Sequence, residues 1–228
     1  MKLTTIALAT LFVAAAAQAQ TTTVNFDGAV QTDITHAYAG LTFNAPLSGS
    51  GPVRTWAAPN ADTPGNVLGL SGQNNFYVFN QTNGAVDIVF DVPVNHVDIR
   101  AAFVVSTELY SASSGNPFMA VYNSTSVTAA TRIGLDQWDI AGDACNTATS
   151  FCVSGWDTLS FTSTGNDIKT IRLTGFAPTA GTAARYAMFD TLTYATAVPE
   201  PASALLASLG GMVLVGLRRR RTAAEDKA

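Results

Sequence analysis

Three aspartates lie close together near the middle of the chain: Asp136, Asp139 and Asp143. Two suitably placed carboxylates are what most glycosidases use to cleave a glycosidic bond. Closely spaced acids also supply the ligands of calcium loops, and the same residue type is common in solvated turns. The spacing therefore leaves three interpretations open: a turn, a calcium loop, or a catalytic pair formed by Asp136 and Asp139.

Trp138 stands between two of these acids. A flat aromatic face beside polar groups is suited to contact a sugar ring, so Trp138, Asp136 and Asp139 are candidate glycan contacts. A tryptophan at such a position serves equally well as an anchor in the core or in a loop.

The chain has two cysteines, Cys145 and Cys152. A bond between them would close a ring of eight residues and contribute about 2.5 kcal/mol in the chain-entropy estimate. Neither a Cys-x-x-Cys spacing nor a neighbouring base is present, so a redox or nucleophilic role is not indicated. We expect a structural disulfide formed in an oxidising compartment.

Other catalytic patterns are absent from the sequence. The only histidines are His36 and His96, too few for a three-histidine zinc site, and no His-Glu-x-x-His or Gly-x-Ser-x-Gly string occurs. Between Gln20 and Val198 there are 13 acidic and six basic residues, a net charge of minus seven. Nucleic-acid binding needs a basic surface, so this balance argues against it. We expect a protein that is not an enzyme and does not bind nucleic acid.

The elements that would position these residues are strands. Val97, Ile99, Ala101 and Phe103 fall on every second position, the spacing of a strand with one buried face. Further runs of this kind are separated by Gly, Asn, Pro and Ser, and no helical pattern lies between them. The strands expected are 22–26, 40–45, 76–80, 87–94, 97–103, 118–122, 158–162, 169–174 and 186–194. The pattern predicts an all-β fold, an antiparallel β-sandwich, over residues 20–197.

The N-terminal segment has the pattern of a secretory signal peptide. Lys2 precedes an apolar run, and Ala17-Gln18-Ala19 has the small-x-small form of a cleavage site. Residues 1–19 are therefore predicted to be removed before Gln20, on export from the cytoplasm.

The C-terminal segment has the pattern of a membrane anchor. Residues 202–217 carry no charge, and as a helix they would extend about 24 Å, against a hydrocarbon core of about 30 Å. Four cations follow directly, Arg218, Arg219, Arg220 and Arg221. Cations beside a span stay on the cytoplasmic side, which places the sandwich outside. We expect a single C-terminal transmembrane helix with a basic tail at 218–228.

The same segment resembles the PEP-CTERM sorting signal of Gram-negative bacteria. Pro199, Glu200 and Pro201 precede the apolar span and the arginine cluster, in the order that defines this family. The resemblance covers residues 198–228. It implies processing by an exosortase, a membrane-embedded cysteine transpeptidase, and transfer to the cell surface or extracellular matrix. Family members commonly occur in bacteria that make exopolysaccharide, which makes an exopolysaccharide or another glycan the implied partner.

A second resemblance concerns the central domain. Residues 24–28, 38–43 and 188–194 are similar to the first and last strands of jelly-roll sandwiches in secreted, often carbohydrate-binding modules. In such modules an acid in the opening turn and an Asp on the final strand often hold a structural calcium ion. Asp27 and Asp190 match these two positions. An ordinary turn at Asp27 and an exposed Asp190 are the alternative.

Together these features predict an exported, transiently anchored protein with a non-catalytic binding or structural jelly-roll domain in or near the biofilm matrix. A secreted carbohydrate-active hydrolase that uses Asp136 and Asp139 is the alternative function.

Overall fold

Alternation of apolar residues determines the faces of the strands, as the central strand β6 (His96–Val105) shows. Val97, Ile99, Ala101 and Phe103 are fully buried. The residues between them point to the opposite face, because side chains alternate along a strand. The sequence pattern therefore predicted both the strand and its buried face correctly.

The computed structural model describes residues 20–28, 32–46, 51–58, 61–63, 65–70, 85–105, 116–147, 152–175 and 185–196. They belong to one compact unit, residues 20–197. The predicted signal peptide, the Pro199–Glu200–Pro201 motif, the apolar span 202–217 and the arginines 218–221 lie outside the described residues, as does the predicted strand 76–80.

The first sheet is antiparallel with the order β1-β12-β6-β10, and β9 also pairs with β6. Its strands are β1 (Gln20–Val24), β6, β9 (Cys152–Val153), β10 (Asp157–Thr162) and β12 (Arg185–Thr196).

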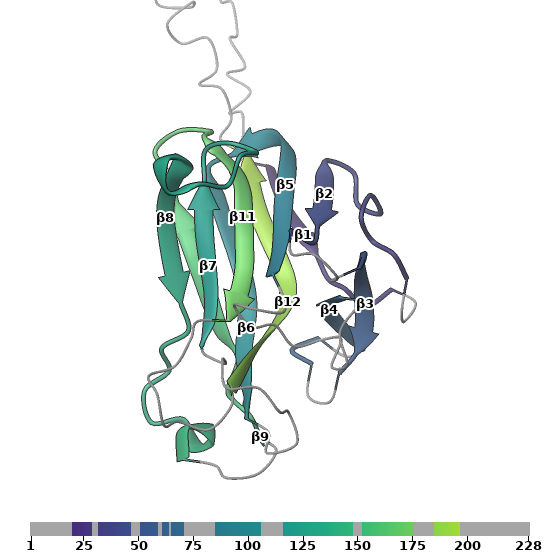
Figure 1. Cartoon of the computed structure of the whole chain (residues 1–228), viewed down its shortest axis with the longest axis vertical. Coiled ribbons are helices and arrows are strands. Elements are labelled where there is room, and N and C mark those ends of the chain that lie inside the picture. Colours follow the sequence, from purple (N-terminus) through teal and green to yellow (C-terminus); the bar gives the residue numbers. More distant parts are fainter. Residues whose placement is uncertain are drawn as a thin grey trace, which may run out of the picture. The chain divides into compact units, whose positions relative to one another are not determined.

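The second sheet is also antiparallel, with the order β2-β5-β11-β7-β8; Figure 1 shows β5, β11, β7 and β8 side by side. Its strands are β2 (Leu41–Asn44), β5 (Ala85–Val94), β7 (Pro117–Tyr122), β8 (Arg132–Gln137) and β11 (Ile168–Gly175). Two short 3-10 turns follow the same region of the chain: Ala129–Thr131 lies between β7 and β8, and Ala144–Thr147 lies between β8 and β9 of the first sheet.

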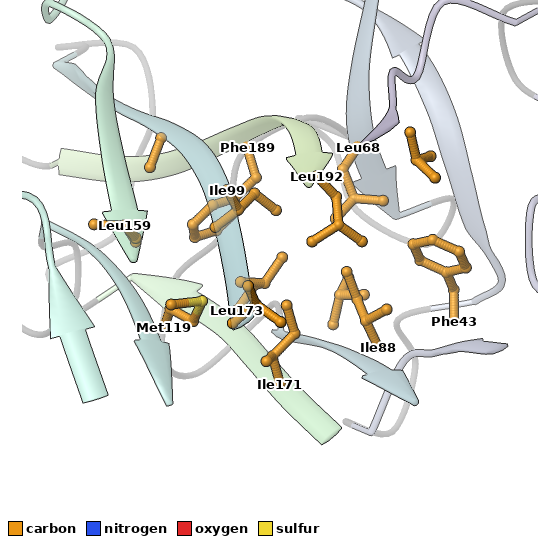
Figure 2. Close-up of a cluster of buried hydrophobic side chains, with 14 of the residues drawn as sticks. Phe43, Leu68, Ile88, Ile99, Met119, Leu159, Ile171, Leu173, Phe189 and Leu192 are labelled. Atoms are coloured by element: carbon orange, nitrogen blue, oxygen red, sulfur yellow. The ribbon is translucent and has the colours of Figure 1, made fainter. Parts of the chain in front are cut away.

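The two sheets share one core. Ile88, Ile171 and Leu173 of the second sheet and Ile99 and Phe189 of the first are fully buried in the same cluster, and Figure 2 shows their side chains converging between the strands. Burial of this apolar surface is the main favourable term in folding. The all-β, antiparallel prediction is confirmed.

A two-stranded hairpin pairs with neither sheet, although its Val53 and Leu68 belong to the main core cluster. It consists of β3 (Val53–Ala57) and β4 (Asn66–Leu70). Val67 of the hairpin packs with Ala102 and Met188 of the first sheet in a second, smaller cluster. Ala102 and Met188 are cross-strand partners and alternate with the core residues, so the hairpin covers the outer face of this sheet.

Sequence reasoning missed β3, β4, β8 and the two-residue β9. Each is short, and β4 and β8 contain Gly69 and Gly134, residues that normally weaken a strand prediction. Tertiary contacts decide these strands, because pairing and packing outweigh weak local preference.

Candidate functional site

Asp27 and Asp190 come together at one hydroxyl group. Asp27 follows β1, Asp190 lies on β12, and Thr63 lies in the connection between β3 and β4. Thr63 Oγ1 is 3.1 Å from Asp190 Oδ2 and 3.3 Å from Asp27 Oδ1. The Thr63 backbone N–H also donates to Asp190 Oδ2 at 2.9 Å. Two acids 163 positions apart in the sequence therefore meet at a single contact point.

The backbone of β12 is irregular at this point. The pairing of β12 with β6 shifts between Asp190 and Leu192, a β-bulge, and Thr191 has a φ of 34°. A threonine with positive φ is an uncommon, strained conformation. Bulges often redirect a side chain, and here the Thr191 N–H donates to Asp190 Oδ1 at 2.7 Å. The bulge places the Thr191 N–H beside Asp190, and this hydrogen bond holds the carboxylate in place.

The Asp27 carboxylate lies next to a glycine, Gly65, which has no side chain to collide with it. Gly65 has a φ of +134°, and a Cβ atom at this residue would stand 3.0 Å from Asp27 Oδ1. The next residue, Asn66, donates its backbone N–H to the same oxygen at 3.3 Å. Asn66 Nδ2 also donates to the carbonyl oxygen of Gly28. The start of β4 is thus fitted closely around Asp27.

The electrostatics of this cluster are unfavourable for Asp190. Its side chain is completely buried, and burial raises its pKa above the usual value, with the nearby Asp27 charge adding to the effect. The N–H groups of Thr63 and Thr191 act in the opposite direction. Among the described residues neither Asp27 nor Asp190 forms a salt bridge. A buried carboxylate beside a second acid favours either a proton or a bound cation.

The donor atoms indicate which kind of cation would fit. Asp27, Asp190 and Thr63 offer only oxygen, the ligand type that Ca²⁺ and Mg²⁺ prefer and that zinc sites rarely use alone. Within the part of the chain that the structure describes, no three His, Cys, Asp or Glu side chains are grouped as a metal site. The oxygen set is compatible with calcium if backbone carbonyls and water complete it; calcium binding itself stays a prediction.

The predicted glycan contact of Trp138 is wrong. Its side chain is 2% exposed, its ring packs edge-on against Phe103 with centroids 4.4 Å apart, and Nε1 donates to the Gly155 carbonyl oxygen at 3.0 Å. A ring buried in this way has no face available to a sugar. The alternative that the sequence left open, a core anchor, is the one observed.

The three neighbouring acids occupy different environments. Asp136 lies on the edge strand β8 rather than in a loop, and its two oxygens accept the N–H groups of Gln137 and Ser160. Asp143 accepts the N–H groups of Cys145 and Gly155, both at 2.7 Å. Asp139 is exposed. Asp136 and Asp143 are therefore engaged as acceptors for backbone groups.

The disulfide prediction is confirmed, because Cys145 and Cys152 are bonded, with their Cα atoms 5.7 Å apart. The bond joins the second 3-10 turn to β9. No helix among the described residues has both the length and the apolar character that a bilayer span requires.

Sequence reasoning missed Thr63, the residue that joins the two acids. It lies in Asp62-Thr63-Pro64-Gly65, a string that indicates a turn but not the strand against which the turn packs. Only the folded chain brings that turn over Asp190.

No protein-family model matches the chain, and no curated protein matches it. Among solved structures it is similar to the K2 cleaved adhesin domain of Lys-gingipain, at 13% identity and a TM-score of 0.44, over 77% of this chain and 99% of that one. It is also similar to the K1 cleaved adhesin domain of Lys-gingipain from Porphyromonas gingivalis W83, at 11% identity and a TM-score of 0.43, over 78% of this chain and 98% of that one. At this level of similarity, neither structure indicates what the chain binds.

Proposed function

We propose that the chain is an exported PEP-CTERM protein whose sandwich domain binds, or helps to build, extracellular material without catalysing a reaction. The observation that carries this proposal is the pair of terminal signals, a signal-peptide pattern at 1–19 and the Pro199–Glu200–Pro201 motif with its apolar run and four arginines. Both patterns require the domain between them to lie outside the cytoplasm.

The sheet register supports this topology. Gln20 pairs directly with Thr196, so the residues at which the two terminal segments join the domain are neighbours across a strand pair, about 5 Å apart. The two ends of the domain therefore lie on one strand pair, β1 and β12, an arrangement compatible with the proposed topology.

Exosortase is the proposed processing partner, with the inner membrane as the transient site and the cell surface or matrix as the destination. The test is mass spectrometry of the extracellular protein from a host that encodes an exosortase. We expect a C-terminus near Pro199–Pro201, and accumulation of the unprocessed form when the exosortase is deleted. An extracellular protein that still ends at Ala228 would contradict the proposal.

Exopolysaccharide is the proposed ligand class. Purified protein should co-sediment with the polysaccharide of its host without releasing new reducing ends. The alternative, a hydrolase using Asp136 and Asp139, predicts release that the Asp136→Asn/Asp139→Asn variant abolishes. The engagement of both Asp136 oxygens by backbone N–H groups favours the non-catalytic function, because these oxygens already serve as hydrogen-bond acceptors for the protein's own backbone.

Calcium is the proposed structural cofactor, with Asp27 and Asp190 as the charged ligands and Thr63 Oγ1 as a neutral oxygen beside them. A cation there would stabilise the buried charge of Asp190. A ligand that binds only the folded form raises the melting temperature, so we expect a higher midpoint in calcium than in chelator, and no difference for Asp27→Asn/Asp190→Asn. Identical midpoints for the wild-type protein would contradict a calcium site.

The finer fold assignment, a jelly roll, is also a proposal. Consecutive strands change sheet from β5 to β6, from β10 to β11 and from β11 to β12, as such folds require.

A further inference from the structure

The residue directly opposite Asp190 in the sheet has a positively charged side chain. Asp190 of β12 pairs in register with Arg100 of β6. Directly opposite residues project from the same face of an antiparallel pair, and opposite charges at such positions attract. The neighbouring pair, Met188 and Ala102, lies on the outer face beneath the hairpin. Arg100 is therefore the expected counter-ion of the buried Asp190 carboxylate.

Arg100 binds a different acid. Its Nε donates to Asp62 Oδ2 at 3.0 Å and its Nη2 to Asp62 Oδ1 at 3.1 Å, a two-point contact. Nη1 donates to Thr158 Oγ1 at 2.8 Å, and Nη2 also reaches the Trp156 carbonyl oxygen at 3.3 Å. Thr158 is the partner of Arg100 on β10, so the guanidinium is turned toward β10 and away from β12.

Asp62 is the residue next to Thr63, which contacts Asp190. Two neighbouring residues of one short segment therefore make different contacts. Thr63 donates to the Asp190 carboxylate, and Asp62 accepts from the Arg100 guanidinium. The charged group that acts on the Asp190 carboxylate is Asp27, which adds negative charge; Arg100 is the cross-strand partner of Asp190, but its guanidinium is bound to Asp62.

We propose that Asp62 is a positioning residue that holds the Arg100 guanidinium away from Asp190 and so keeps the negative charge of the Asp27–Asp190 pair available for a divalent cation. The inference rests on the calcium site proposed above. Without Asp62, Arg100 would turn to its cross-strand partner and compete with the cation.

A purely structural function of the Arg100–Asp62 pair makes a different prediction, and the double variant separates the two. Asp62→Ala removes the ion pair and releases Arg100. Asp62→Ala/Arg100→Met lacks the ion pair as well, but has no cation to compete. If the ion pair only stabilises the connection between β3 and β4, the two variants should show the same change in the Asp190 pKa and in calcium affinity. If Asp62 restrains Arg100, Arg100→Met should reverse the change that Asp62→Ala causes.

The first measurement needs no metal. In chelator, the Asp190 side-chain carboxyl is titrated by NMR in the full mature protein. We expect its pKa to fall in Asp62→Ala, because a guanidinium beside a carboxylate favours the charged form, and to return toward the wild-type value in Asp62→Ala/Arg100→Met. The same pKa in wild type and Asp62→Ala would overturn the inference whether or not calcium binds.

The second measurement is calcium affinity by isothermal titration calorimetry. We expect Asp62→Ala to bind Ca²⁺ about tenfold more weakly, the order of magnitude for a cation beside a carboxylate, and the double variant to recover most of this loss. Asp87→Asn is the matched control, because Arg172 makes a comparable two-point contact to Asp87 in the other sheet; Arg172→Lys replaces it if the yield of folded protein falls. Absence of binding in wild type would refute the calcium proposal alone, whereas wild-type affinity in Asp62→Ala would refute the restraint on Arg100.

Discussion

The carboxylate of Asp143 connects two segments of backbone, because one oxygen accepts the N–H of Cys145 and the other that of Gly155. Asp136 connects β8 to the edge strand β10 in the same way, through the N–H of Ser160. Unpaired backbone N–H groups are costly when they are shielded from water. At the residue scale, these acids stabilise the ends and edges of strands.

An Asp143→Asn variant should therefore lose stability. The amide keeps one acceptor oxygen and turns an NH₂ group toward a backbone N–H, leaving that donor unsatisfied at a cost of about 1–3 kcal/mol. Urea denaturation measures the loss. Asp139→Asn is the matched control, because Asp139 is exposed and its substitution should leave the urea midpoint unchanged. Equal midpoints for the two variants would contradict a stabilising contribution of the Asp143 hydrogen bonds.

Asp190 should make stability depend on pH in chelator. Because its pKa is raised in the folded state, the folded protein holds this proton more tightly than the unfolded chain, and the group favours folding at acid pH. That contribution is lost as the pH rises from the ordinary Asp pKa through the raised one. Relative to Asp190→Asn, the wild-type protein should lose stability over this range, measured by urea denaturation at each pH, and calcium should reverse the trend. A difference that stays constant with pH would rule out a raised Asp190 pKa.

At the element scale, β8 and β10 close one side of the sandwich. They belong to different sheets, and their contact requires a residue without a side chain at Gly134, because a Cβ there would overlap the ring of Phe161. The hairpin β3–β4 is held in turn by Val53 and Leu68, which lie in the main core cluster, by a small cluster around Val67, and by the ion pair of Asp62 with Arg100. Packing between elements thus determines which residues each position tolerates.

Gly134→Ala should be destabilising by about 1–3 kcal/mol, the usual cost of overpacking. Gly165→Ala is the control, because no atom lies within 4 Å of a Cβ at that residue. Thermal denaturation compares the two. If Gly134→Ala has the same melting temperature as the wild-type protein, the close contact between β8 and β10 is not present in solution.

At the scale of the whole molecule, residues 20–197 form a unit with its own core and one internal disulfide. Such a unit should fold without the terminal segments, and most reliably where the disulfide can form. The net charge of minus seven over these residues favours the solubility of this unit.

A fragment of residues 20–197 should therefore unfold in a single cooperative transition. Reduction of the Cys145–Cys152 bond should lower its free energy of unfolding by about 2.5 kcal/mol, the chain-entropy value for a ring of this size. Urea denaturation with and without reductant measures the difference, and Cys145→Ser/Cys152→Ser should show the low value in both conditions. A fragment that aggregates or unfolds without a transition would show that the terminal segments are needed for folding.

The sequence by itself determined the features that depend on neighbouring residues. Alternation in 97–103 predicted a strand with one buried face, and the short separation of Cys145 and Cys152, seven positions, predicted their bond, because both depend on local geometry. The terminal patterns determined the predicted topology for the same reason. Asp27 and Asp190 could be named from the sequence only through a resemblance to other sandwiches, since no local pattern relates residues so far apart.

Only the tertiary structure decided the environment of each side chain. Trp138 lies in the core, Asp136 stabilises a strand edge and Thr63 joins two distant acids, because each contact is made by a segment remote in the sequence. The same holds for Arg100, which stands opposite one carboxylate and binds another. Strand pairing and burial bring these groups together, and neither can be derived from the order of residues around any one of them.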